Sequence, residues 1–358
     1  MRKRAAIASC PQKGEKDMRE VAVIGVDMTR FGRYADKGIE ELAVTPVFGA
    51  LKNAGIGWKD VEAAYVAHEY QGLAAGQRIL AGVGASGIPI TNIGNACSAG
   101  ATAFREAYLM IALGMYDVVL ALGCEKMARG LIDQLPDDAW RTLGIDLIPA
   151  QFALLARRHM EDYGTTQEQF AKVAVKAHKN GALNPYAQHR KEVTMEEVLN
   201  SRMISDPITL LMCCPTGDGA AAAILCSMEK ARQFTARPVK VAASALNSET
   251  YSTGTGTQNF GTIIRSAPSV ITISARQAYE QAGLGPEDLN VVELHDAFAT
   301  SELLHYEELN LCQEGDGGRL IDEGAVELGG KVPVNTSGGL LAKGHPLGAT
   351  GVAQIVEL

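Results

Sequence analysis

The sequence contains no long apolar run and no secretory signal. No stretch approaches the roughly 18 consecutive apolar residues of a membrane-spanning helix. Residues 1–16 are basic and polar and lack the apolar segment of a signal peptide. We therefore expect a cytoplasmic chain that has no membrane partner and begins with a disordered tail over residues 1–18.

A basic excess and paired cysteines are also absent. Lys and Arg number 33 against 41 Asp and Glu, for a formal net charge of −8, whereas nucleic-acid-binding domains usually show a basic patch or a high pI. The seven Cys residues are odd in number and show no repeated CxxC spacing, which excludes paired zinc ligands. We predict no nucleic-acid partner, no bound metal, and free thiols that suit the reducing cytosol.

Aromatic residues make up only 6% of the chain, while Gly (38 residues), Ala and Val are common. Short apolar runs typical of buried strands alternate with amphipathic helices. The expected strands are 21–26, 61–66, 117–123, 217–226 and 289–294, and the expected helices are 39–54, 74–83, 96–113, 166–181, 275–282 and 300–311. This alternation predicts an α/β fold, with a mostly parallel sheet and helices on both of its faces.

A Pro-marked boundary near residue 237 divides the chain into two parts of similar pattern. We assign residues 19–236 to an N-terminal half, with a charged, helical insertion at about 125–205, and residues 237–358 to a C-terminal half. The segment CSAGAT at 97–102 aligns with HPLGAT at 345–350, and both open an apolar helix. The match is short for a Gly- and Ala-rich chain, but a pseudo-twofold axis between two halves would bring these two helix starts together.

Cys97 lies in the segment NACSAG, between a turn-rich stretch and a helix of small residues. The unsatisfied N–H groups and the positive dipole at a helix start stabilise a thiolate, so Cys97 is a candidate nucleophile. A small buried Cys without a chemical role is the alternative.

Two His residues are candidates to act with Cys97. His345 lies on a turn in KGHPLG, where a His near a thiol acts as its base or simply caps a helix. His295 follows the expected strand at 289–294, and ligands gather at the carboxyl ends of strands, so it is a candidate oxyanion donor. The next residue, Asp296, is expected to cap the helix that follows.

The motifs NACSAG, HDAFA and NTSGGLLAKGHPLGATG, in this order, resemble the thiolase superfamily, and most of all its sterol-carrier-protein-type and archaeal acetyl-CoA acetyltransferase-like branch. The segments CCPTGDGAAAAIL and ARQAYEQAGLGPEDL resemble the same group. The resemblance covers residues 19–358. It implies the thiolase fold, in which two similar βαβαβαββ halves form a five-layer α-β-α-β-α sandwich.

The resemblance implies a transferase, namely a thiolase or acyl-CoA:acetyl-CoA C-acyltransferase that acts on a 3-oxoacyl-CoA. Cys97 would carry the acyl group as a thioester, His345 would activate Cys97, and His295 would belong to an oxyanion site. The N–H of Cys97 would contribute to a second oxyanion hole. Coenzyme A would be a substrate, with no permanently bound cofactor. A homodimer and a small OB-fold, zinc-ribbon companion subunit are expected from the same resemblance.

A Gly-containing turn precedes His345 and either allows close backbone approach to a substrate or is simply a turn. Its residues do not decide between these interpretations. Our candidate substrate-binding residues are Asn335, Ser337, Gly338, Gly339 and Phe298.

Two departures from the family pattern stand out. Sterol-carrier-type members carry a second, acid–base Cys in an HDCF motif, where this chain has Ala297. That role cannot be matched from sequence to Cys124, Cys213, Cys214 or Cys312. The chain also stops within the helix that follows His345. We therefore expect the native protein to continue beyond Leu358, or a partner to complete the site, because missing strands would expose a sheet edge.

Three other functions compete with thiolysis. A decarboxylating condensing enzyme, similar to a ketoacyl synthase or a hydroxymethylglutaryl-CoA synthase, also uses a Cys and two His residues. An aldolase branch of the superfamily has Tyr at the two His positions and lacks the Cys, so the residues here argue against it. An inactive scaffold for an OB-fold acyl-CoA-binding partner is disfavoured, because Cys97, His295 and His345 all keep their motif context.

Overall fold

The computed structural model describes residues 18–128, 130, 147–235, 237–248 and 268–358. Almost all of the predicted tail, and part of the predicted insertion, lie outside the described residues. None of the described helices combines the length and apolar character needed to cross a bilayer.

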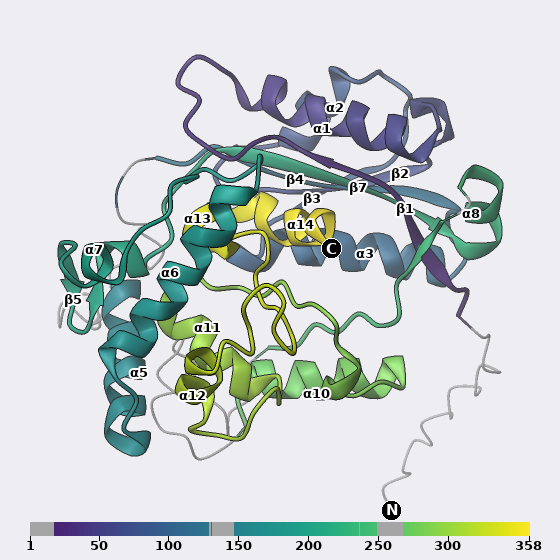
Figure 1. Cartoon of the computed structure of the whole chain (residues 1–358). Coiled ribbons are helices and arrows are strands. Elements are labelled where there is room, and N and C mark those ends of the chain that lie inside the picture. The colour runs from purple at the N-terminus through teal and green to yellow at the C-terminus, as the bar shows by residue number, and fades with distance from the viewer. Residues whose placement is uncertain (1–17, 129, 131–146, 236, 249–267) are drawn as a thin grey trace, which may run out of the picture.

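One six-stranded sheet runs through the molecule and is covered by helices on both faces (Figure 1). Helices α1 (Ile39–Ala54) and α2 (Ala75–Ala81) lie on one face. Helices α3 (Ala99–Ala112) and α14 (Leu347–Glu357) lie on the other. The predicted arrangement of helices on both faces of a sheet is therefore confirmed for this sheet.

The sheet contains β1 (Val21–Met28), β2 (Ala63–Ala67), β3 (Ile90–Ile93), β4 (Val118–Glu125), β7 (Gly219–Ser227) and β8 (Val239–Lys240). Their order is β3-β2-β4-β7-β1-β8. Strand β2 pairs in parallel with both β3 and β4, whereas the other three pairs are antiparallel. The sheet is therefore mixed rather than mostly parallel, and the parallel strands gather at the β3 edge.

The strands of this sheet that were predicted from the sequence are the ones that are buried along most of their length. Strands β4 and β7 are buried at every residue, as their continuous apolar runs indicate. Edge strand β3 has the four-residue sequence ITNI, in which Thr and Asn separate two Ile residues and no residue is fully buried, and it was not predicted. Helix α1 covers the predicted residues and ends at Gly55, whose φ of 70° gives the left-handed conformation of a helix C-terminus.

Helices α3 and α14 pack directly against each other beneath the sheet. A Cβ built on Gly100 of α3 would lie 2.7 Å from the carbonyl oxygen of Gly348 in α14, and one built on Gly351 would overlap the amide of Ala101. Only glycine permits backbones to approach so closely. The structure thus brings together the two segments that the short internal match aligned.

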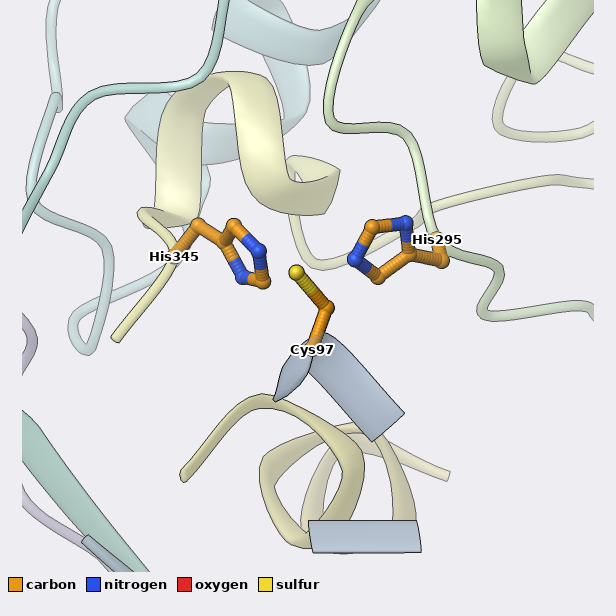
Figure 2. A group of neighbouring side chains, drawn as sticks. All are labelled: Cys97, His295 and His345. Carbon is orange, nitrogen blue, oxygen red and sulfur yellow. The ribbon is translucent and has the colours of Figure 1, made fainter. Parts of the chain in front are cut away.

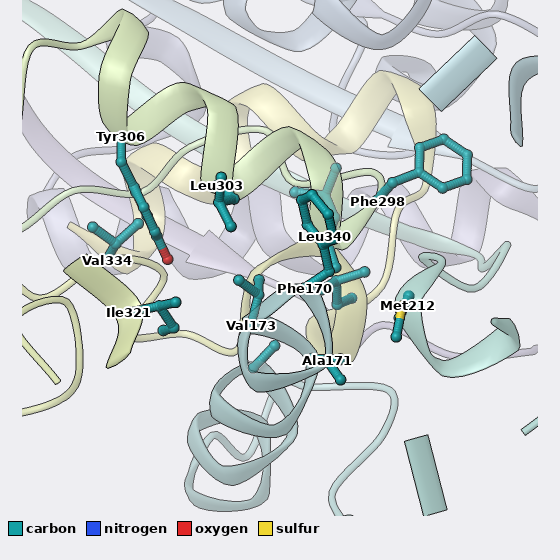
Figure 3. Close-up of a cluster of buried hydrophobic side chains, with 14 of the residues drawn as sticks. Phe170, Ala171, Val173, Met212, Phe298, Leu303, Tyr306, Ile321, Val334 and Leu340 are labelled. Carbon is teal, nitrogen blue, oxygen red and sulfur yellow. The ribbon is translucent and has the colours of Figure 1, made fainter. Parts of the chain in front are cut away.

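A second core surrounds α6 (Gln167–Leu183), and Figure 3 shows its centre. Phe170 and Val173 of α6 share a buried cluster with Leu303 and Tyr306 of α11 (Ala299–Glu308). The same cluster contains Phe298, and it therefore anchors the segment that follows His295. The other helices of this region are α5 (Ile148–Tyr163), α7 (Met195–Leu199), α12 (Gly317–Asp322) and α13 (Gly339–Lys343).

The remaining elements are short or peripheral. They are α8 (Met228–Phe234), α10 (Val270–Ala282), the two-stranded sheet of β5 (Met203–Ser205) and β6 (Ile208–Thr209), and the 3₁₀ turns Trp58–Asp60, Ala96–Ser98, Leu210–Met212 and Pro286–Asp288.

The predicted second sheet is not formed within the described ranges. The expected strand at 289–294 makes one parallel bridge, between Val292 and Val334. Pro333 has no N–H with which to extend the ladder, and Asn335 leaves the strand conformation with a φ of 53°. Among the described residues, the C-terminal half contributes only the short β8 to a sheet of more than two strands. The prediction of a strand at 289–294 was therefore wrong.

Candidate active site

Cys97 lies in the 3₁₀ turn Ala96–Ser98, between edge strand β3 and helix α3. Ala96 has a φ of 46°, which is uncommon for a residue other than glycine. The carbonyl of Asn95 accepts hydrogen bonds from the Ser98 amide (3.1 Å) and the Ser98 hydroxyl (2.8 Å). These bonds hold the backbone on both sides of Cys97.

His345 follows Gly344, which has a φ of 107°, and precedes Pro346 at the start of α14. Its Nδ1 lies 2.8 Å from the Thr350 hydroxyl, which donates its single hydrogen to the Pro346 carbonyl at 3.0 Å. Thr350 must therefore accept from His345, so Nδ1 carries the proton and Nε2 keeps a lone pair. Nε2 is buried and has no hydrogen-bond partner among the described residues, which leaves it available as a base.

His295 lies in the loop between the Val292 bridge and α11. Asn335 fixes this loop, because its Oδ1 accepts from the Leu294 amide at 2.9 Å while its Nδ2 donates to buried Glu302 at 2.8 Å. The Nε2 atom of His295 is also buried without a hydrogen-bond partner in the described part of the chain.

The three predicted residues meet in one place. Figure 2 shows the Cys97 sulfur between the two imidazole rings. The sulfur and one ring nitrogen of each His all lie within 4.8 Å of one another. The ring centroids of His295 and His345 are 4.9 Å apart, with an angle of 81° between the planes. Residues that are far apart along the chain thus form a single thiol–imidazole cluster.

At neutral pH all three side chains are uncharged. Burial, assisted by the negative charge of Glu69, raises the pKa of the Cys97 thiol to about 11. Burial lowers the pKa of His295 to about 4 and that of His345 well below its usual value. Loss of solvation therefore outweighs the stabilisation of a thiolate that the helix start provides. A thiol beside an unprotonated imidazole suits proton transfer at the moment of attack.

Comparison with known families places this cluster in context. The model of the thiolase N-terminal domain matches residues 21–229, and the model of the thiolase C-terminal domain-like family matches residues 252–358. The chain belongs to the thiolase family. The predicted resemblance and the thiolase fold class are thereby confirmed.

Individual relatives of this thiolase-family chain cover most of its length. Acetyl-CoA acetyltransferase of Methanothermobacter thermautotrophicus is 40% identical over 352 residues, which cover 95% of this chain and 90% of the relative. Sterol carrier protein 2 of Bos taurus is 41% identical over 358 residues and 94% of this chain, which spans only 65% of that relative's length. The solved structure named Ltp2-ChsH2(DUF35) aldolase has a TM-score of 0.83 at 29% identity, covering 96% of this chain and 90% of that one.

These relationships identify the chain as an enzyme of the acyltransferase class, as predicted. The likeness to a structure named as an aldolase does not change the side chains at the centre of this site, which are one Cys and two His. The three atoms are also of the kind that bind zinc. The absence of a bound metal was predicted from sequence and stays a prediction.

Three of the candidate substrate-binding residues of this thiolase are engaged with the protein itself. Both polar side-chain atoms of Asn335 are hydrogen-bonded within the buried loop described above. The Ser337 hydroxyl donates to Glu293 at 2.7 Å. Phe298 stacks on Phe152 with 4.6 Å between ring centroids. These contacts position the His295 loop, and a role in substrate binding stays a prediction.

The other two candidates, Gly338 and Gly339, have φ values of 98° and 58°. A Cβ on Gly338 would lie 2.7 Å from the backbone of α6, and one on Gly339 would overlap the Asp296 carboxylate. Asp296 accepts from the Leu340 amide at 2.7 Å, so it caps α13. The sequence-based expectation that Asp296 caps the following helix, α11, was wrong. The absence of a side chain at Gly338 leaves room for α6, and its absence at Gly339 leaves room for the Asp296 carboxylate. Contact of the two glycines with substrate stays a prediction.

Two carboxylates that the sequence analysis did not single out support the Cys97 turn. Glu69 follows β2, and its carboxylate accepts from the Asn95 amide at 2.7 Å. Glu125 ends β4 and accepts from the amides of Glu69 (2.9 Å) and Gly348 (3.1 Å). Strands β2, β3 and β4 are parallel and end at one edge of the sheet. The rule that functional groups gather at strand ends would have identified both residues.

Replacing Glu69 with Gln is expected to make Cys97 easier to alkylate. The substitution removes a charge that, after burial, raises the pKa of the thiol, and it keeps an oxygen that can accept from Asn95. We expect the apparent pKa of Cys97 to fall by about 0.5–1 unit, so that labelling by iodoacetamide at pH 8 is about 3–10 times faster. The measurement is the labelling rate of the Cys97 peptide over a range of pH.

The control is Glu161→Gln, which removes an exposed carboxylate on α5. It is expected to leave the labelling profile unchanged. An apparent pKa in Glu69→Gln that equals or exceeds the wild-type value would show that the Glu69 charge does not act on Cys97.

Proposed function

We propose that this chain is an acyl-CoA:acetyl-CoA C-acyltransferase that cleaves or forms a 3-oxoacyl-CoA through a thioester on Cys97. The observation that carries the proposal is the Cys97 thiol between two neutral imidazoles (Figure 2). The Nε2 atom of each imidazole has no hydrogen-bond partner among the residues that the structure describes. The name of the archaeal relative, acetyl-CoA acetyltransferase, supports coenzyme A thioesters as the substrate class.

In the proposed cleavage reaction, Nε2 of His345 takes the thiol proton as the Cys97 sulfur attacks the 3-oxo carbon. Its bonded partner Thr350 keeps the ring in the tautomer that can accept this proton. His295 is neutral and would donate one N–H to a thioester oxygen, as an oxyanion-site group. The N–H of Cys97 would serve the second oxyanion hole. Free coenzyme A then attacks the acyl-Cys97 thioester and removes the acyl group.

Mass spectrometry of the intact protein tests this proposal. Mixing the chain with acetyl-CoA, or with a short 3-oxoacyl-CoA, is expected to add one acyl group. Proteolysis should place that group on the peptide containing Cys97, and free coenzyme A should remove it as acyl-CoA. Failure of several acyl-CoAs to modify the folded protein would contradict the proposal and favour the scaffold. Turnover that requires a malonyl donor and releases carbon dioxide would favour the decarboxylating condensing enzyme.

A companion subunit is also proposed. The name of the similar solved structure joins Ltp2 to ChsH2(DUF35), which supports a second component for this chain, with the predicted OB-fold and zinc ribbon. The homodimer, the division into halves near residue 237, the lack of a permanent cofactor and the cytoplasmic location stay predictions.

A further inference from the structure

Cys214 lies beside the site although it is distant from Cys97 in sequence. Its amide donates to the Ala297 carbonyl at 2.9 Å. The preceding residue, Cys213, forms an antiparallel bridge with Phe298. This backbone pairing places Cys214 alongside the segment that begins with His295. Cys214 is partly buried and forms no disulfide with another described Cys.

The electrostatics of the thiol agree with this placement. Burial raises the pKa of Cys214 well above its ordinary value, and the neighbouring Cys97, Cys213 and Asp296 side chains raise it further where they are ionised. Cys214 is therefore close enough to Cys97 for the charge of one thiol to affect the other, and it stays protonated at neutral pH. The same site holds the Nε2 atom of His345, which is buried and has no hydrogen-bond partner within the described part of the chain; His345 is only 3% exposed.

The proposed reaction requires a proton that the three central residues do not readily supply. Cleavage leaves the bonding electron pair on the α-carbon of the departing acyl-CoA, and this carbon must gain a proton. His345 has by then accepted the Cys97 proton, and His295 is assigned to the thioester oxygen. Ala297, next along the His295 loop, has no group that can transfer a proton.

We propose that Cys214 is the acid–base residue that protonates the substrate α-carbon in cleavage and deprotonates it in condensation. This assignment rests on the proposed thiolase function. The bond between the α-carbon and the 3-oxo carbon breaks as the Cys97 sulfur–carbon bond forms. The electron pair on the α-carbon takes the Cys214 proton, which leaves the Cys214 thiolate.

The second half of the reaction restores both thiols. The proton of the incoming coenzyme A thiol moves to the Cys214 thiolate as its sulfur bonds to the acyl carbon. The Cys97 sulfur–carbon bond breaks, and the Cys97 thiolate regains its proton from the His345 imidazolium. No oxidant or reductant is needed, and the protein returns to its starting state.

Exchange of the α-protons of acetyl-CoA in deuterium oxide tests the assignment directly. In Cys214→Ala and Cys214→Ser, we expect the rates of exchange and of thiolysis to fall about 10²–10³-fold. The extent of acetylation on Cys97 should remain close to that of the wild type, because a thiolate leaves without a proton far more readily than a carbanion does. The serine variant keeps the side-chain size, so it serves if the alanine variant folds poorly.

Cys213→Ser is the matched control. This neighbouring Cys is also partly buried, and its thiol donates to the Thr209 carbonyl at 3.4 Å, so exchange should be unchanged. Exchange in Cys214→Ser within about threefold of wild type would overturn the assignment while the acyl-Cys97 adduct upholds the proposed function. Loss of the adduct in both Cys214 variants would overturn it by indicating a structural role. Absence of an adduct in the wild type would reject the proposed function itself.

Discussion

The Cys97→Ala variant is expected to lose about 10⁵-fold or more in turnover of 3-oxoacyl-CoA, while it keeps its fold. The proposed chemistry passes through a covalent bond to the Cys97 sulfur, and neither imidazole beside it can form an equivalent thioester. The residue lies in a short turn at the start of α3 and is only partly buried. Removal of one sulfur atom should therefore leave the packing of α3 against the sheet intact.

Turnover is measured by the loss of 3-oxoacyl-CoA in the presence of free coenzyme A, and folding by the thermal midpoint and the near-ultraviolet circular dichroism. Cys312→Ala is the control, because Cys312 is also a free, partly buried thiol and is not one of the residues assigned to the site. It should retain turnover. If a folded Cys97→Ala variant kept more than about one tenth of wild-type turnover, Cys97 would not be the nucleophile.

The Gly348→Val variant is expected to lose about 3 kcal/mol of folding stability, together with nearly all of its activity. A Cβ at this position would lie 2.5 Å from the carbonyl oxygen of Cys124 and 2.7 Å from that of Ala67. Both oxygens belong to strands of the central sheet and cannot move as a flexible side chain would. Helix α14 must therefore shift, and His345, three residues earlier, shifts with it away from Cys97.

The stability of Gly348→Val is measured as the midpoint of urea unfolding. The displacement of His345 is measured as a loss of Cys97 acylation, because His345 is the proposed base for Cys97. Gly57→Val is the matched control. Gly57 has an extended backbone, and a Cβ there would meet its nearest side-chain atoms at an ordinary 3.5 Å. A Gly348→Val variant as stable as Gly57→Val would show that α14 does not depend on close contact with the sheet.

Local patterns in the sequence were sufficient for most elements of the N-terminal half. Continuous apolar runs predicted β4 and β7, because strands buried on both faces need no polar alternation. They were insufficient for β3, which has only four residues and lacks a continuous apolar run; it joins the sheet by pairing with β2. They also failed at 289–294, where Pro333 and the turn at Asn335 prevent a ladder that the apolar residues alone would favour.

The candidate site also has features that local sequence patterns predicted and features that they could not predict. The motifs around Cys97, His295 and His345 identified the three residues, because each motif combines a reactive side chain with small residues and a turn. Which thiol and which nitrogen carries a proton could not be predicted. The pKa of Cys97 depends on its burial in the folded chain and on Glu69, and the tautomer of His345 depends on the bond from Thr350 to Pro346.

The sequence by itself determined the family, the fold class and the three reactive side chains, since these follow from local composition and motif order. Only the tertiary structure decided that Asp296 caps α13, that Glu69 and Glu125 support the Cys97 turn, and that Cys214 lies beside Ala297. The physical reason is that burial, charge and hydrogen-bond partners arise between segments that are distant along the chain, and no local pattern records which of those segments will meet.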